Sequence, residues 1–342
     1  MSEKQLYSLN RDALSLAEVI HILSQEHDNQ TAIQLARDWC MQTKDLYIKK
    51  ISMEFMYING HYDQLEQLIS ENKNSDLVSN QKWAEIYQLM LERRQKRISP
   101  EMILSKLETF DTNGEPELML LVEFLKVSVY YSLYKFHKVG NFLEKEKRLL
   151  DQVEDRFMAS SFKVRTYQNL FFYHWTRNEL IIARKYAFQV LNETIDMQVK
   201  ASLHVNLGLT YTFDSFEQAM LHLQKALSIS EKYGYTYITQ LIERQNIPFI
   251  CAHFNRPELF KTDDLSEHAH LEIKKGNLQK AVAILETISL DSPFKLYYMG
   301  MAKRDKQILI ESYHQFVRKR GDYFFARLPL NAIKELSKSI PS

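Results

Sequence analysis

Hydrophobic residues return at three- and four-residue spacing along nearly the whole chain, from about Leu14 to Leu336. This spacing places apolar side chains on one face of successive α-helices. The interruptions are short, as at 59–61, 111–115 and 275–277. Because each has the length of a turn between antiparallel helices, the pattern predicts a succession of helix pairs.

Glycine and proline are scarce. The 342 residues include 8 Gly and 7 Pro, fewer than average usage supplies. The tight turns of a many-stranded sheet depend on these residues. The composition therefore predicts an all-α fold.

One segment has the spacing of a tetratricopeptide unit shortened by one residue: 207–211, followed by Ala219 and Leu223. Small side chains at Gly208 and Ala219 allow the two helices of a pair to approach closely. A similar unit spans 276–285. Such units stack on their neighbours, so we expect a tetratricopeptide-like, right-handed helical superhelix.

The predicted organisation is a polar leader at 1–12 followed by a single helical-repeat domain at 13–342, with capping or dimerisation helices at about 310–342. The start of the chain lacks the apolar segment of a signal peptide, and no run of about 18 uncharged apolar residues occurs. Cys40 and Cys251 are isolated, as expected of core residues in a reducing compartment. We therefore expect a cytoplasmic protein with no membrane partner.

Charge is large but balanced, with 44 Lys and Arg against 43 Asp and Glu. Binding to a nucleic-acid backbone requires a sustained basic excess, which no segment carries. The cations at 93–97 stand where one predicted helix ends, a position that favours positive charge. The charge pattern does not predict nucleic-acid binding.

Motifs for catalysis are absent from the sequence. It contains no glycine-rich phosphate loop, HExxH, CxxC or GxSxG motif. His268 and His270 are two residues apart on a predicted helix, so they point about 200° away from each other and cannot share a metal ion. We expect neither an enzyme nor a metal or cofactor site.

In a solenoid of this kind the first helix of each pair faces the concave side. Taking Ala183, Ala219 and Ala281 as the small position of the second helices, the preceding helices supply the groove. The candidates are Arg165, Gln168, Phe172, Trp175, Thr176, Leu209, Thr212, Arg244 and Gln245, with His270 and Lys274 further along. This mixed polar and aromatic surface suits an extended peptide or a partner helix. The alternative is that these are ordinary solvated positions.

Four segments together resemble the arbitrium receptors, the peptide-sensing lysis–lysogeny regulators of temperate phages of bacilli: 161–165, 178–184, 207–219 and 322–330. The resemblance extends from about Leu14 to Leu336. It implies a tetratricopeptide-like superhelix that dimerises and binds a short secreted peptide in its concave groove. In its usual form such a receptor also binds DNA through an amino-terminal helix-turn-helix.

The chain departs from the family pattern in two places. Family members carry roughly forty further residues before the position of Leu14, where a helix-turn-helix is built. The chain is therefore either a truncation or a natural variant that does not bind DNA directly. The family clamps its peptide with asparagines and an arginine, whereas Phe172, Thr176, Leu209 and Gln198 stand at those places. If a peptide binds, it should be more apolar.

The resemblance and the closing aromatic stretch predict a homodimer, with a two-fold, mainly apolar contact. The candidate interface residues are Tyr323, Phe324, Phe325, Leu328, Leu330, Ile333 and Leu336. We therefore expect a regulator in the bacterial host cytoplasm that controls lysis and lysogeny by binding a short peptide or another regulatory protein. The alternative is a scaffold that sequesters or heterodimerises with another regulator independently of any peptide.

Overall fold

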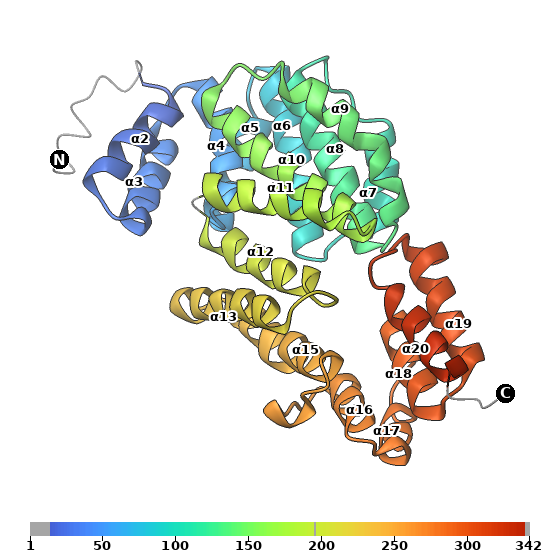
Figure 1. Ribbon diagram of the computed structural model, residues 1–342. Coiled ribbons are helices and arrows are strands. Elements are labelled where there is room, and N and C mark those ends of the chain that lie inside the picture. Colours follow the sequence, from blue (N-terminus) through green and yellow to red (C-terminus); the bar gives the residue numbers. More distant parts are fainter. Residues whose placement is uncertain (1–13, 195, 339–342) are drawn as a thin grey trace. The chain divides into compact units, whose positions relative to one another are not determined.

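The computed structural model describes residues 14–194 and 196–338, and the predicted leader at 1–12 lies outside them. Helices follow one another through the whole described part, and no β-strand occurs in it (Figure 1). The all-α prediction is thus confirmed. None of the helices in these two ranges is long and apolar enough to cross a bilayer.

Two compact units make up the described residues. Unit 1 comprises 14–133 and 141–166, and unit 2 comprises 134–140, 167–194 and 196–338. Helix α10 (Arg156–Thr176) contributes to both. The sequence predicts a single helical-repeat domain at 13–342, and the association of the two units into one such domain stays a prediction.

Unit 1 contains four helix pairs in chain order. They are α2 (Leu16–Glu26) and α3 (Asn29–Gln42), α4 (Leu46–Ile58) and α5 (Tyr62–Lys73), α6 (Val78–Arg94) and α7 (Pro100–Glu108), and α8 (Pro116–Ser132) and α9 (Gly140–Leu150). Their starts follow from local sequence. Ser15 and Glu18 form a reciprocal capping box at α2, and Asp28 and Asp45 cap the next two helices.

Unit 2 continues with helices and short irregular turns. They are η2 (Phe136–Lys138), α11 (Leu180–Glu193), α12 (Met197–Thr210), α13 (Phe216–Tyr233), α14 (Thr236–Leu241), η3 (Ile242–Asn246), α15 (Ile247–His253), η4 (Pro257–Leu259), α16 (Leu265–Lys274), α17 (Leu278–Leu285), α18 (Pro293–Lys303), α19 (Lys306–His314), η5 (Gln315–Arg320) and α20 (Arg327–Lys338). The elements η3 and η5 are π-helical turns.

The predicted repeat at 207–223 forms the helix pair α12 and α13. A Cβ at Gly208 would lie 3.0 Å from the backbone oxygen of Ala219, so only glycine permits this approach. The tetratricopeptide-like pairing predicted from these small residues is confirmed. A second close approach, not predicted from the sequence, occurs in α18, where a Cβ at Gly300 would lie 2.8 Å from the Leu309 side chain on α19.

Candidate ligand pocket

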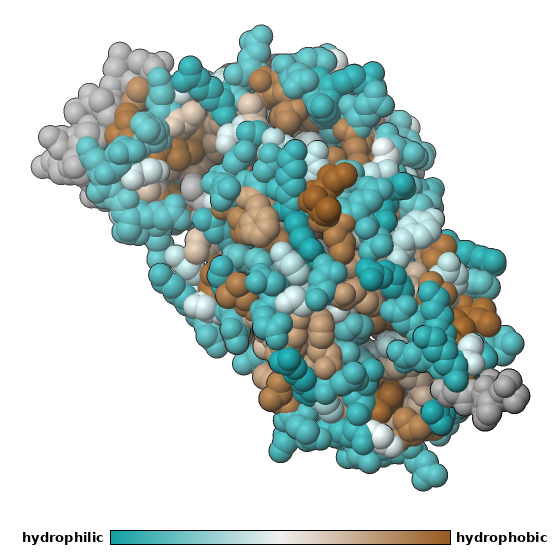
Figure 2. Space-filling view, in the orientation of Figure 1, coloured by the Kyte–Doolittle hydropathy of each residue, from teal (hydrophilic) through white to brown (hydrophobic). Residues whose placement is uncertain are grey.

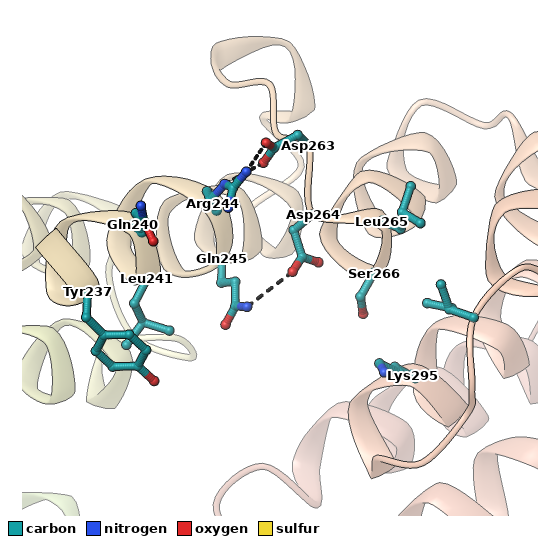
Figure 3. A pocket seen from close by; sticks show the side chains of 11 residues that line it. Tyr237, Gln240, Leu241, Arg244, Gln245, Asp263, Asp264, Leu265, Ser266 and Lys295 are labelled. Carbon is teal, nitrogen blue, oxygen red and sulfur yellow. Dashed lines mark hydrogen bonds and ion pairs between the residues drawn. The ribbon is translucent and has the colours of Figure 1, made fainter. Parts of the chain in front are cut away.

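A pocket of ≈ 490 Å³ opens in unit 2, between η3 and the amino-terminal ends of α16 and α18 (Figure 3). Its lining consists of Tyr237, Gln240, Leu241, Arg244, Gln245, Asp263, Asp264, Leu265, Ser266, Ile288 and Lys295. Small-molecule pockets have volumes of about 300–1,000 Å³ and combine apolar walls with a few polar groups. The volume of this pocket falls in that range, but its lining is mostly polar and charged, with Leu241, Leu265 and Ile288 as its aliphatic members.

A proline explains the local backbone at the pocket. Pro248 has no N–H to donate to the carbonyl of Arg244, four residues earlier. The π-helical turn η3 occupies this stretch, and the hydroxyl of Thr262 donates to the Arg244 carbonyl instead, at 2.6 Å. π-Helical turns are frequent at functional sites. Here the turn places two successive polar side chains, Arg244 and Gln245, at the pocket wall.

Arg244 and Asp263 form an ion pair at the pocket wall (Figure 3). The guanidinium of Arg244 forms a two-pronged ion pair with the carboxylate of Asp263, with Nε donating to Oδ1 at 2.7 Å. This contact lowers the pKa of Asp263. The amide of Gln245 donates to Asp264 at 3.1 Å, and Asp264 also caps α16 by accepting the backbone N–H of Glu267. Both acidic side chains are thereby held in place.

Lysine and apolar side chains complete the wall. Lys295 projects from α18 and pairs with Asp291 at 3.0 Å. Tyr237 is 77% exposed and Leu265 46% exposed, so both apolar surfaces are open to solvent at the pocket. The pocket therefore places two cations, each paired with an aspartate, beside exposed apolar surface.

A buried polar cluster lies on α16 and α18, the two helices whose amino-terminal ends line the pocket. The hydroxyl of Tyr298 donates to Glu267 at 2.8 Å, and burial raises the pKa of Glu267 to about 8. His270 stacks on Tyr298 with ring centroids 4.3 Å apart and is fully buried, which lowers its pKa well below the usual value. His270 therefore does not line a groove, contrary to the sequence-based expectation.

The groove candidates that lie in unit 2 differ in burial. Arg244 and Gln245 line the pocket. Trp175, Thr176 and Thr212 are buried. The Trp175 ring packs on Phe324 and Phe325. The hydroxyls of Thr176 and Thr212 donate to backbone carbonyls three or four residues earlier in the chain. These three expectations are corrected. The half-buried residues Gln168, Phe172 and Leu209 stay predictions.

Arg165 belongs to unit 1 and is engaged there. Its guanidinium donates to Glu54 at 2.8 Å, and the Glu54 side chain is completely buried. The rings of Tyr57 and Phe124 lie 5.1 and 5.6 Å from the guanidinium carbon. The expectation of a free groove-lining Arg165 is corrected, because Glu54, more than a hundred residues away in sequence, already binds it.

The predicted dimer-interface residues differ in how much of each side chain is exposed. Phe324, Phe325 and Leu328 lie inside unit 2, so they have no surface for a partner and this part of the expectation is corrected. The rings of Phe324 and Phe325 pack against Phe213 and Phe294 of the same unit. The remaining four are exposed or partly exposed: Tyr323, Leu330, Ile333 and Leu336.

Residues 14–194 and 196–338 add no metal site to this description. In the residues described, no group of three or more His, Cys, Asp or Glu side chains is arranged to hold a metal ion. Hydrophobic residues on the face shown in Figure 2 lie in small groups among hydrophilic ones. Surface hydrophobicity on that face therefore does not single out one partner surface.

Successive packed helix pairs define a helical-repeat protein. A family model described as AimR transcriptional regulator-like matches residues 32–335, and the chain belongs to this family. The resemblance inferred from sequence is confirmed. This is a family of regulators and not of enzymes.

Individual relatives are distant in sequence. An uncharacterized protein of Bacillus anthracis is 25% identical over 245 residues, which are 65% of this chain and 86% of that protein. The solved structure of phAimR-Ligand is similar with a TM-score of 0.77 at 19% identity, over 94% of this chain and 98% of that chain. The structure of SeMet-phAimR gives a TM-score of 0.69 at 18% identity, over 93% and 86%.

Proposed function

We propose that the chain is an arbitrium-type phage regulator that acts in the cytoplasm of the bacterial host by binding a short peptide in the pocket of unit 2. The pocket is the observation that carries the proposal, because it presents Arg244, Asp263 and Lys295 beside exposed apolar side chains. Membership of the regulator family supports the class of function. The proposal includes no direct contact between the described residues and DNA.

The peptide proposal is tested by calorimetry on the full chain. The titrants are synthetic hexapeptides with free termini, including those encoded by any small open reading frame beside the gene. We expect Arg244→Asp to weaken binding at least tenfold, because it removes the guanidinium from the pocket wall and places like charge beside Asp263. Thermal melts should be unchanged, since both side chains of the pair are more than half exposed.

The matched control is Arg256→Asp. Arg256 also pairs with a carboxylate, Glu217, at 3.5 Å and is similarly exposed, but it does not line the pocket. We expect its variant to bind as wild type. Equal loss of affinity in both variants, or none in either, would place the ligand elsewhere. No binding of any peptide would favour the alternative function, sequestration of another regulator through protein contacts.

For the protein partner we propose a homodimer, or a mixed dimer with a full-length relative, through the exposed side of α20. Leu330, Ile333 and Leu336 follow one another at three-residue spacing on this helix, so they share one side of it. Light scattering should give twice the chain mass of 40.6 kDa. Leu330→Glu with Ile333→Glu should return the mass to one chain, and a monomer in wild type at micromolar concentration would reject the dimer.

A further inference from the structure

The non-helical segment between η5 and α20, residues 321–326, lies against other parts of unit 2. The backbone N–H groups of Tyr323 and Phe324 both donate to the carbonyl of Thr176, at 2.7 and 3.2 Å. Thr176 is the last residue of α10, so its carbonyl has no partner within the helix. The segment is thus bound through main-chain hydrogen bonds at the end of α10.

The adjacent rings of Phe324 and Phe325 pack into a pocket formed by Trp175, Phe213 and Phe294, here called the aromatic seat. The ring of Phe324 contacts Phe213 at 5.1 Å and Trp175 at 6.0 Å between centroids. The ring of Phe325 contacts Phe294 at 5.0 Å and also packs on Trp175. The seat is therefore assembled from α10, α18 and the turn after α12.

Both ends of the segment are anchored. A Cβ at Gly321 would lie 2.9 Å from the backbone nitrogen of His137, so the backbone at Gly321 lies directly against η2. At the other end Arg327 donates to the side-chain oxygen of Asn178 at 3.1 Å and lies 4.1 Å from the centre of the Phe213 ring. Main-chain bonds from Ala326 to Asp322 and from Arg327 to Phe324 fold the segment into a turn, so it is held as a turn and not as an extended peptide.

One polar group in the seat is left unsatisfied. The indole N–H of Trp175 is buried and has no hydrogen-bond partner among the described residues. A buried donor without an acceptor is unfavourable. Residues 321–326 therefore fill the aromatic seat but leave the Trp175 N–H without an acceptor. A ligand with an oxygen atom at this point would accept a hydrogen bond from it.

We propose that residues 321–327 act as a displaceable internal ligand, and that a short peptide with two adjacent aromatic residues binds the same seat by displacing them. Because α20 begins at Arg327, displacement also releases the start of that helix. The seat is separate from the pocket at Arg244, and the proposal stands independently of the ligand proposed there.

The test uses the full chain and a labelled peptide, Gly-Asp-Tyr-Phe-Phe-Ala-Arg, which copies residues 321–327. Gly321→Ala should loosen the segment, because the added Cβ meets the backbone of His137. Gly234→Ala is the matched control, since Gly234 has the same φ of +71° but no atom within 4 Å of the added Cβ. Arg327→Ala loosens the other end and serves as a second, milder variant.

We expect the peptide to bind Gly321→Ala and Arg327→Ala at least tenfold more tightly than wild type or Gly234→Ala, by fluorescence anisotropy. A peptide with both Phe replaced by Ala should bind none of them. Hydrogen exchange at the amides of Tyr323 and Phe324 should be faster only in the two loosened proteins. If neither variant binds the peptide better than wild type, the segment is an ordinary part of the core and the proposal is overturned. Arg244→Asp should leave this binding unchanged, which separates it from the pocket.

Discussion

Replacing Arg165 by Ala should lower the free energy of unfolding by about 3–5 kcal/mol, because it leaves the carboxylate of Glu54 buried without its cation. Glu54 is completely buried and accepts hydrogen bonds from Arg165, Tyr87 and Ser161. The two remaining hydroxyl donors carry no charge. We expect a clear fall in the melting temperature of the full chain by calorimetry.

Arg97→Ala is the matched control for this change. Arg97 also faces a carboxylate, at 3.8 Å from Glu66, but its side chain is 63% exposed. Exposed pairs contribute little, so the variant should stay within about 0.5 kcal/mol of wild type. If Arg165→Ala has the same melting temperature as wild type, Glu54 does not depend on Arg165. Arg165 would then again be a candidate residue of the groove.

Phe324→Ala should destabilise the chain by about 3–5 kcal/mol, the usual cost of removing a fully buried phenylalanine ring. The loss combines the transfer of the ring from water with the cavity left between Trp175 and Phe213. The neighbouring Tyr323 is half exposed, and we expect Tyr323→Ala to change stability by far less. Chemical denaturation of both variants measures the difference.

The variants Phe324→Ala and Tyr323→Ala also show whether Phe324 lies in the core or at a dimer interface. If Phe324→Ala dissociated a dimer while leaving the unfolding of the chain unchanged, Phe324 would belong to the interface predicted from sequence. A loss of stability with unchanged mass by light scattering is the result that its burial predicts. The side of α20 that carries Leu330 and Ile333 then remains the proposed contact.

The helical pattern was predictable because it is local. Apolar spacing, caps such as Ser15 with Glu18, and the small residues Gly208 and Ala219 act within one helix or one pair. The ion pair of Arg165 was not predictable, since Glu54 lies in a different helix pair and nothing near either residue marks the other. Burial of Phe324 and Phe325 likewise depends on rings contributed by helices far apart in sequence.

The pocket was predictable in part. Arg244 and Gln245 were identified as candidates, but Asp263, Asp264 and Lys295 were not. Pro248 was a usable signal, because a proline inside a helical pattern leaves a carbonyl without its donor and so points to an irregular turn nearby. The residue that donates to this carbonyl, Thr262, comes from a loop whose path depends on tertiary packing.

Hydrogen exchange on the full chain, with and without a hexapeptide that binds in calorimetry, tests the central claim most directly. The claim is that the ligand of this regulator binds in the pocket of unit 2. We predict slower exchange in the two segments that form the pocket wall, 237–245 and 263–266. Protection confined to unit 1, with exchange in both segments unchanged, would contradict it.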